Sequence, residues 1–247
     1  MIESANENTI NITDLDQKIY RIYPLLRAID LFSDNKNALI KPHMWDDPFE
    51  NFFLAAKVFD GSDEVDISSV QQSWFGQCWT TVPESDAMWR IYSPNKDSVR
   101  ISSTIRKVFS SIYDVTDPYA ALSQFIGRVE YAEIDQITSI CKTMNFRDLA
   151  HGGGNRDFAK TLLIKRKEFE HEHEVRLLYS DVAGKYRSAN HVLFDFDTLS
   201  LVEEVMFDPR LDMRIVAAYS DLITSNGFKG DVSRSHFYDA PKLIISL

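Results

Sequence analysis

The chain has 247 residues, of which 44% are hydrophobic and 26% are charged, the balance of a globular protein with a sizeable core. This composition excludes a disordered chain and a collagen-like or coiled-coil rod. Lys and Arg number 27 against 37 Asp and Glu, which gives a net charge of −10. General nucleic-acid binding is therefore not expected, because phosphate affinity needs a concentrated cationic face.

Strand and helix signals alternate irregularly along the chain. Runs of β-branched and aromatic residues predict strands at 19–23, 38–41, 74–81, 98–102, 127–134, 172–179, 191–196, 202–207 and 232–238. Caps and apolar spacing predict helices at 25–32, after Pro48, at 86–92, from 105, at 155–169 and at 212–226. A regular strand–helix rhythm and a dinucleotide fingerprint are both missing from the sequence, which indicates an α+β fold with an irregular, split mixed sheet and flanking helices.

The domain organisation is expected to be simple. Residues 1–15 are polar and predict a loosely held leader, and residues 16–247 predict a single catalytic or ligand-binding domain. Cys78 and Cys141 lie in apolar stretches, which predicts two buried free thiols in a reducing compartment. The sequence shows no signal peptide and no apolar run of membrane-spanning length, so a cytoplasmic protein without membrane association is expected.

The segment 170–179 is the most unusual one because charged residues alternate with apolar ones. On a strand, Glu172, Glu174 and Arg176 share one face. Arg176 relieves Glu174, whereas Glu172 has no partner nearby in the sequence. Two carboxylates that face a cleft raise the pKa of one of them. The pattern therefore predicts either an acid–base site or a solvated strand face.

The same strand places His171 and His173 on its other face, where two imidazoles at this spacing can chelate zinc. A third ligand at a recognised spacing is missing from the sequence, so we expect no bound metal. A metal-dependent hydrolase or nuclease that uses these two residues with nearby carboxylates remains one functional hypothesis.

Aromatic residues gather near short polar elements, and Trp89 and Tyr92 lie one turn apart on a predicted helix face. Core packing accounts for most of them, and Ser85 with its neighbours makes a good helix N-cap. A ligand pocket or protein interface built from these aromatics is the other interpretation. It would make the chain a non-enzymatic ligand-sensing or protein-binding module.

Four motifs follow one another between Ile19 and Tyr238. They are Asp47-Pro48-Phe49-Glu50-Asn51, Cys78-Trp79-Thr80 with Met88-Trp89-x-x-Tyr92, Glu172-x-Glu174-x-Arg176, and Val202-Glu203-Glu204-Val205-Met206-Phe207-Asp208-Pro209. In this order they resemble a widespread bacterial family of unknown function with N-D-P-F-D/E, C-F-S…M-W-x-x-Y and E-x-E-x-R motifs. The departures are mild, with Asp46 at the usual Asn, Trp79-Thr80 in place of Phe-Ser, and Phe169 in place of a Trp.

A second, weaker similarity is to the ADP-ribosyltransferase fold. Those enzymes place an Arg or His on their first strand, a polar element in the middle and a Glu, often as E-x-E, on a late strand. This chain offers Arg21, then Thr80-Thr81 with Ser85, then Glu172-x-Glu174 in the same order. The resemblance implies an NAD-consuming enzyme that needs no metal, with Glu174 as the catalytic carboxylate and Glu172 as the second candidate.

The resemblance also implies how NAD is held. Forked Arg hydrogen bonds suit a ribose or a diphosphate, and an aromatic wall can stack on nicotinamide. The implied NAD-binding residues are Arg21, Tyr23, Thr80, Ser85, Trp89, Tyr92 and Arg176. Such a pocket suits a bacterial toxin or an antiviral defence effector, with an unknown macromolecular acceptor and a neutralising or defence-system partner protein.

Overall fold

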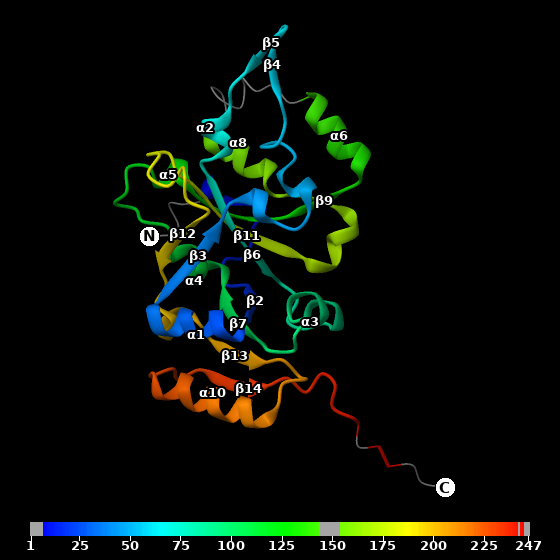
Figure 1. The fold of residues 1–247 in the computed structure, drawn as a ribbon, viewed down its shortest axis with the longest axis vertical. Coiled ribbons are helices and arrows are strands. Elements are labelled where there is room, and N and C mark those ends of the chain that lie inside the picture. The colour runs from blue at the N-terminus through cyan, green and yellow to red at the C-terminus, as the bar shows by residue number, and fades with distance from the viewer. Residues whose placement is uncertain (1–6, 144–153, 242, 245–247) are drawn as a thin grey trace. The chain divides into compact units, whose positions relative to one another are not determined.

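A computed structural model describes residues 7–143, 154–241 and 243–244 (Figure 1). The chain forms two compact units, and each is built from three separate segments. Unit 1 comprises Met1–Ile19, Asn37–Val82 and Thr104–Asp195, and unit 2 comprises Tyr20–Lys36, Pro83–Ser103 and Phe196–Leu247. Each unit combines helices with a mixed sheet, which confirms the predicted α+β class.

The sheet of unit 1 is centred on a buried apolar strand. Its order is β1 (Thr9–Ile10), β8 (Gln124–Arg128), β11 (Glu174–Ser180) and β6 (Trp74–Thr80), and β3 (Lys36–Ile40) pairs with β6 and with β12 (His191–Asp195). β1 runs parallel to β8, while β11 is antiparallel to both β8 and β6. Val175, Leu177 and Leu178 of β11 are fully buried, because this strand lies between two others with both of its faces covered.

Two short ribbons complete the strands of unit 1. β9 (Glu130–Ala132) and β10 (Ile164–Arg166) pair in parallel, and β4 (Val58–Asp60) and β5 (Asp63–Val65) form a hairpin that projects from the rest of the unit (Figure 1). The helices are α2 (Ser68–Gln71), α4 (Ile105–Ser110), α5 (Ala120–Ser123), α6 (Ile134–Thr143) and α8 (Gly154–Thr161). Short 3-10 turns lie at η2 (Pro42–Met44), η3 (Pro48–Asn51) and η4 (Lys167–Glu172).

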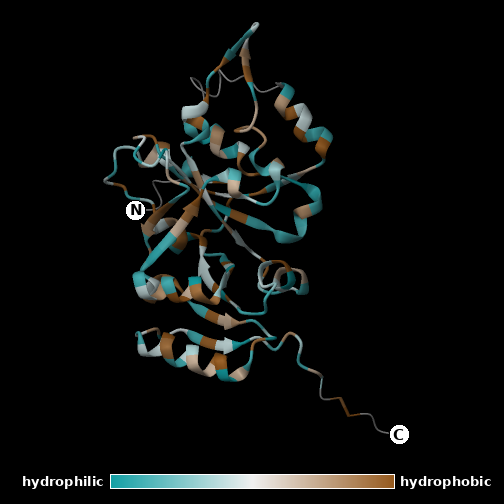
Figure 2. Ribbon diagram, viewed as in Figure 1, coloured by the Kyte–Doolittle hydropathy of each residue, from teal (hydrophilic) through white to brown (hydrophobic). Residues whose placement is uncertain are grey.

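Unit 2 has the strands β2 (Lys18–Pro24), β7 (Ser98–Thr104), β13 (Glu204–Phe207) and β14 (Asp231–Arg234). β13 is antiparallel to β7 and parallel to β14. The helices are α1 (Leu25–Asp34), α3 (Asp86–Tyr92), α9 (Thr198–Leu201) and α10 (Met213–Ser225). Both α1 and α10 carry a mixture of hydrophobic and hydrophilic residues (Figure 2). Their buried hydrophobic side chains include Leu31 of α1 and Val216 of α10.

Several predicted boundaries are confirmed by their caps. The Ser85 hydroxyl accepts a hydrogen bond from the Met88 N–H and begins α3, and the Asp212 side chain accepts one from the Arg214 N–H at the start of α10. Gly227, with a φ of 98°, follows the end of α10. These boundaries depend on interactions within a few residues, which the sequence displays directly.

Only the first half of the predicted helix 155–169 is confirmed, as α8. α8 ends at Thr161, and the chain continues as β10 and then as the turn η4. β10 pairs with β9 and turns the Lys165 side chain inward, where it contacts carboxylates from distant segments. A tertiary interaction thus overrides a local helical pattern.

Other predictions on unit 1 need smaller corrections. The chain after Pro48 forms only a 3-10 turn, and the predicted strand 127–134 is broken into β8 and β9. Cys141 is exposed and Cys78 is half-buried, so the thiols are free but not both buried. Within the predicted leader, Ile10 belongs to β1 and is buried, because β1 extends the sheet beside β8. In unit 2, the last strand ends at Arg234, earlier than predicted.

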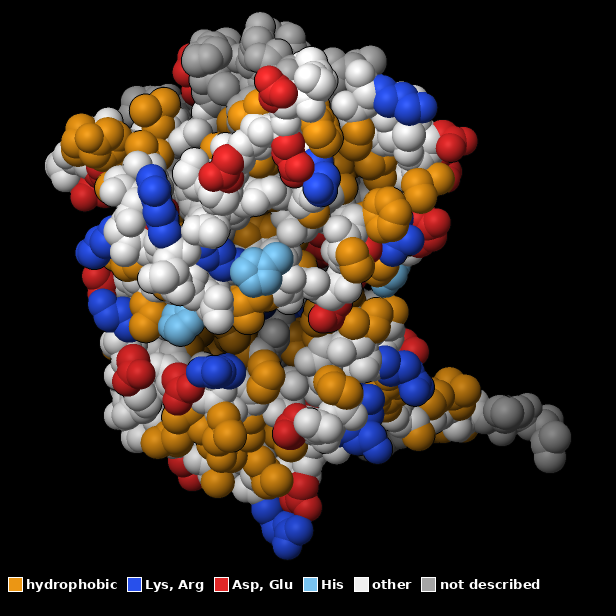
Figure 3. Space-filling model, turned by 45° about the horizontal axis from the view of Figure 1, so that its top comes forward, with side chains coloured by type: hydrophobic (Ala, Val, Ile, Leu, Met, Phe, Trp, Pro, Cys, Tyr) orange, Lys and Arg blue, Asp and Glu red, His pale blue; other side chains and the backbone are white. Residues whose placement is uncertain are grey.

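The described helices include none with the length and apolarity needed to cross a bilayer. On the face drawn in Figure 3, acidic and basic side chains are interspersed, with apolar patches between them. Charge of both signs is therefore mixed over that face.

Gly76 tests the packing of unit 1. A Cβ at this position of β6 would lie 2.6 Å from Cζ2 of Trp45 and 3.1 Å from Leu178. We expect Gly76→Ala to lower the free energy of unfolding by about 1–3 kcal/mol, because a rigid indole must move. Chemical denaturation measures this, with the exposed Ser62→Ala as the control. Equal stability of the two variants would contradict the packing described here.

Candidate active site

Five charged side chains meet in the interior of unit 1. They are Glu50 of η3, Lys165 of β10, Glu172 at the end of η4, and Glu174 and Arg176 on one face of β11. Each of these residues is at most 5% exposed. Buried charges of this kind are costly unless they are paired, so their mutual geometry decides what the cluster can do. We call these five residues the carboxylate cluster.

Lys165 is the centre of the carboxylate cluster. Its Nζ lies 2.9 Å from Oε1 of Glu50 and 3.0 Å from Oε1 of Glu174, and it also donates a hydrogen bond to Oε2 of Glu172. An ammonium has three N–H donors, so each carboxylate can receive one. Burial lowers the pKa of Lys165, but the charges of Glu174 and Glu50 outweigh burial and raise it, so the amine stays protonated.

Arg176 closes the cluster on the other side. Its Nη2 lies 2.6 Å from Oε2 of Glu50 and 2.6 Å from Oε2 of Glu174, and its Nη1 donates to the Leu162 carbonyl at 2.7 Å. The guanidinium carbon lies 4.5 Å from the ring centroid of Trp45. Arg176 is therefore held by charge, by a backbone carbonyl and by a cation–π contact.

Backbone geometry brings Glu172 and Glu174 together although only the second lies on the strand. His173 between them has a left-handed φ of 43°, which separates η4 from β11. The Thr80 hydroxyl donates to the Glu172 carbonyl at 2.6 Å, and the Glu174 N–H donates to the Tyr131 hydroxyl at 2.8 Å. The predicted shared strand face is thus wrong in its local form, yet the two carboxylates do converge.

The carboxylate cluster contains three acidic and two basic groups, so full ionisation would leave one excess negative charge. Burial, followed by the neighbouring Glu174, raises the pKa of Glu172 to about 7. Burial also acts to raise the pKa of Glu174, but the charges of Arg176 and Lys165 hold it below its usual value. The environment pushes the two pKa values apart, so at neutral pH one carboxyl is ionised and the other is partly protonated.

A second, balanced ion pair borders the cluster. Arg166 of β10 donates to Asp47 at 2.9 Å, and its guanidinium lies over the rings of Phe49 and Phe169. The Phe169 ring also lies 4.7 Å from Nζ of Lys165. Motifs that are more than 120 residues apart in the sequence, Asp-Pro-Phe-Glu and Glu-x-Glu-x-Arg, therefore meet in one place.

The predicted site residues divide between the two units. Unit 1 brings Glu172, Glu174, Arg176 and Thr80 together. The other five, Arg21, Tyr23, Ser85, Trp89 and Tyr92, belong to unit 2.

Within unit 2, these residues have local partners. The Arg21 guanidinium lies 5.1 Å from the ring centroid of Tyr23, and the indole N–H of Trp89 donates to Glu84 at 2.7 Å. Trp89 is buried, whereas Tyr92 is 38% exposed.

Sequence reasoning missed Lys165, Glu50 and Tyr131 as members of the site. Glu50 was visible as the last acid of the Asp-Pro-Phe-Glu motif, but Lys165 lay inside a predicted helix and gave no signal of its own. His171 and His173 are both exposed, and the described residues contain no group of three or more His, Cys, Asp or Glu side chains arranged to hold a metal ion.

The chain's fold and motifs can be compared with known proteins. Residues 88–177 match the family described as "Protein of unknown function (DUF2971)", which confirms the resemblance to a family of unknown function over that stretch. This stretch includes Met88-Trp89-x-x-Tyr92 and Glu172-x-Glu174-x-Arg176. No curated protein matches the sequence.

Three solved structures of DarT from Thermus sp. 2.9 are similar to this chain. The complex with NAD+ is 10% identical, with a TM-score of 0.41, and the similarity covers 91% of this chain and 98% of that chain. The complex with carba-NAD+ is 11% identical, with a TM-score of 0.39, and the similarity covers 90% of this chain and 97% of that chain. The complex with ADP-ribosylated ssDNA is 10% identical, with a TM-score of 0.40, and the similarity covers 91% of this chain and 96% of that chain. The similarity is limited to the path of the backbone, and it does not assign a role to any residue.

Removal of Arg176 tests the electrostatics of the cluster. Arg176→Met leaves Glu50 and Glu174 buried with a single cation, so we expect the free energy of unfolding to fall by about 3–5 kcal/mol. The double variant that also carries Glu50→Gln removes one of the two buried carboxylate charges, so it should recover part of the lost free energy of unfolding. Chemical denaturation measures both, and Arg214→Ala, whose side chain is 91% exposed, is the control that should stay unchanged. Similar stabilities for Arg176→Met and Arg214→Ala would contradict the buried pairing.

The raised pKa of Glu172 predicts how the stability of the folded protein depends on pH. The folded protein keeps the Glu172 proton to a pH of about 7, against 4.5 for an ordinary Glu, so its stabilising contribution is full below about pH 4.5 and is lost as the pH rises through 7. Glu172→Gln mimics the protonated form at every pH. The free energy of unfolding of this variant, relative to wild type, should therefore increase by roughly 1–3 kcal/mol between pH 5 and pH 8.

Denaturation at a series of pH values measures this difference. The control is Glu170→Gln, an exposed neighbour in η4, whose difference from wild type should not vary with pH. Parallel pH profiles for wild type and Glu172→Gln would show that the Glu172 pKa is ordinary.

Proposed function

We propose that the chain is an NAD-consuming ADP-ribosyltransferase-like enzyme that uses Glu174 and Glu172. The observation that carries the proposal is the charge count of the carboxylate cluster, in which three buried acids face two cations. When Glu172 is ionised, the cluster carries a buried excess of negative charge, which lowers the stability of the folded protein but favours a reaction in which positive charge develops nearby.

Cleavage of the bond between nicotinamide and ribose is such a reaction. Nicotinamide leaves with the electron pair of the bond, and the ribose passes through an oxocarbenium-like state, as in glycoside hydrolysis. Glu174 is the group suited to stabilise that state, because Arg176 and Lys165 hold its pKa low and keep it ionised. A carboxylate in this role also accepts a hydrogen bond from a ribose hydroxyl.

Glu172 is suited to the second half of the transfer. A carboxyl with a pKa of about 7 is matched to general-base catalysis at neutral pH. In the proposed step the acceptor hydroxyl or amine loses its proton to Glu172 as its oxygen or nitrogen bonds to the ribose carbon. Glu172 would then influence transfer to the acceptor more than cleavage of the nicotinamide bond.

The remaining residues have supporting roles in this proposal. Arg176 is fully buried and pairs with Glu174, so we assign it the positioning of that carboxylate in place of direct NAD contact. Thr80, which holds the Glu172 carbonyl, positions the other acid. The assignment of NAD binding to Arg21, Tyr23, Ser85, Trp89 and Tyr92, all in unit 2, stays a prediction from the sequence.

The biological setting that fits this chemistry is a bacterial toxin or an antiviral defence effector in the cytoplasm. A macromolecular acceptor would receive the ADP-ribose, and a neutralising partner protein would protect the host. Loss of host growth on expression of the wild-type chain, but not of Glu174→Gln, is the outcome expected for this setting.

Nicotinamide release from NAD tests the enzymatic reaction. Glu174→Gln keeps the size of the side chain but removes its charge, so the rate should fall by about 10²–10³. Glu172→Gln should reduce release less than it reduces transfer to acceptors in a bacterial lysate. Glu170→Gln, exposed in η4, is the matched control and should keep full activity. Wild-type protein that releases no nicotinamide with any lysate would overturn the proposal.

The contact of each acid in the cluster with Lys165 or Arg176 favours a second candidate function. In that case the five charges only hold unit 1 together, and the chain acts as a binding module without a reaction. The two candidates predict different results when folded Glu174→Gln protein is compared with wild type. An enzyme loses its activity in this variant, whereas a binding module has no activity in either protein. Circular dichroism and denaturation establish that this variant is folded before its activity is compared.

A further inference from the structure

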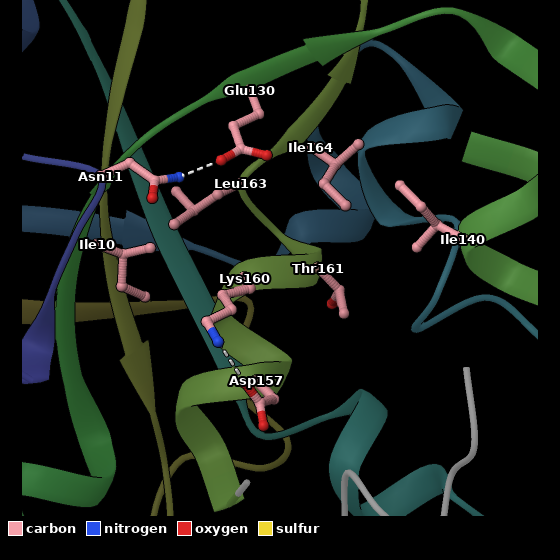
Figure 4. A pocket seen from close by; sticks show the side chains of 9 residues that line it. All are labelled: Ile10, Asn11, Glu130, Ile140, Asp157, Lys160, Thr161, Leu163 and Ile164. Atoms are coloured by element: carbon pink, nitrogen blue, oxygen red, sulfur yellow. Dashed lines mark hydrogen bonds and ion pairs between the residues drawn. The ribbon is translucent and has the colours of Figure 1, made fainter. Parts of the chain in front are cut away.

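A cavity of about 420 Å³ lies in unit 1, apart from the carboxylate cluster (Figure 4). β1, β9, β10, α6 and α8 or the residues adjoining them supply its walls. Its nine lining residues are Ile10, Asn11, Glu130, Ile140, Asp157, Lys160, Thr161, Leu163 and Ile164. The volume is that of an ordinary small-molecule site.

The cavity has an apolar middle and two polar ends. Figure 4 shows Asn11 and Glu130 together at one end and Asp157 with Lys160 at the other, with Leu163 between them. Apolar side chains thus supply the contact area, and the polar groups are set apart from each other along the cavity. An elongated molecule with an apolar body matches this distribution.

The charges at the two ends differ. The Lys160 ammonium lies 2.7 Å from Oδ1 of Asp157, so this end carries a balanced pair. At the other end, the Asn11 amide donates to Glu130 at 2.6 Å, which fixes the carboxylate without neutralising it. Among the nine lining residues, Glu130 therefore carries the uncompensated charge.

Strand alternation separates this cavity from the carboxylate cluster. In the register of the β9–β10 ribbon, Glu130 lies beside Ile164 and Tyr131 lies beside Lys165. Successive side chains point to opposite faces. Glu130 and Ile164 accordingly line the cavity, while Tyr131 and Lys165 turn toward Glu174.

We propose that this cavity binds a small organic cation, with an apolar body against Ile140 and Ile164 and an ammonium or similar head on the Glu130 carboxylate. A charged hydrogen bond at one end and a hydrocarbon wall along the middle select such a molecule over a neutral or anionic one of the same length. The proposal does not depend on the function assigned to the carboxylate cluster.

A matched set of probes tests the chemistry. We would titrate n-hexylamine, n-hexanol and n-hexanoate into protein carrying ¹³C-labelled Ile δ-methyl groups and follow the signals of Ile10, Ile140 and Ile164. The ammonium form should bind at least tenfold more tightly than hexanoate and should shift these methyl signals. Raising the salt concentration should reduce its affinity.

Two variants distinguish the cavity from general attraction of cations to an acidic protein. Glu130→Gln should bring hexylamine and hexanol to within about twofold of each other, whereas the exposed Glu133→Gln should leave the preference unchanged. Ile164→Trp should fill the space and weaken all probes at least fivefold. Absence of methyl shifts with hexylamine, equal binding of hexanoate, or an unchanged preference in Glu130→Gln would each overturn the proposal.

Discussion

The Lys165 ammonium is the contact on which the candidate site depends, because it binds Glu50, Glu172 and Glu174 at once. Coulomb interactions between buried groups are several times stronger than between solvated ones, so these three acids stay close because Lys165 lies among them and Arg176 pairs with two of them. The β9–β10 pairing fixes the register of Lys165 beside Tyr131, whose hydroxyl accepts the Glu174 N–H. Two paired strands of three residues each thereby place both the charge and the backbone of the site.

Aromatic rings limit the contact of these charges with water. Trp45 lies over Arg176, and Phe169 lies over Lys165. Gly76 leaves the space that the Trp45 ring occupies, so the position of the ring is tied to the packing of β6. Since water screens charge, the rings strengthen the interactions inside the cluster.

The sequence predicts the elements whose causes are local and fails where the cause is distant. Ser85 and Asp212 begin helices through bonds to nearby N–H groups, and the apolar run of β6 identifies a buried strand without further information. The segment around Lys165 has a helical pattern, yet it forms β10 because its partners come from β9 and from Glu50. The convergence of Glu172 and Glu174 was predicted, but through a shared strand face and not through the left-handed His173.

The proton on Glu172 decides how the cluster responds to a change of charge beside it. With a pKa of about 7, this carboxyl lies near the midpoint of its titration at neutral pH. A positive charge nearby lowers the pKa of a carboxyl, so the ionised fraction of Glu172 depends on the charges beside it. A solvated pair of carboxylates would already be ionised and would have no such response, so the burial that makes the cluster costly is also what makes it responsive.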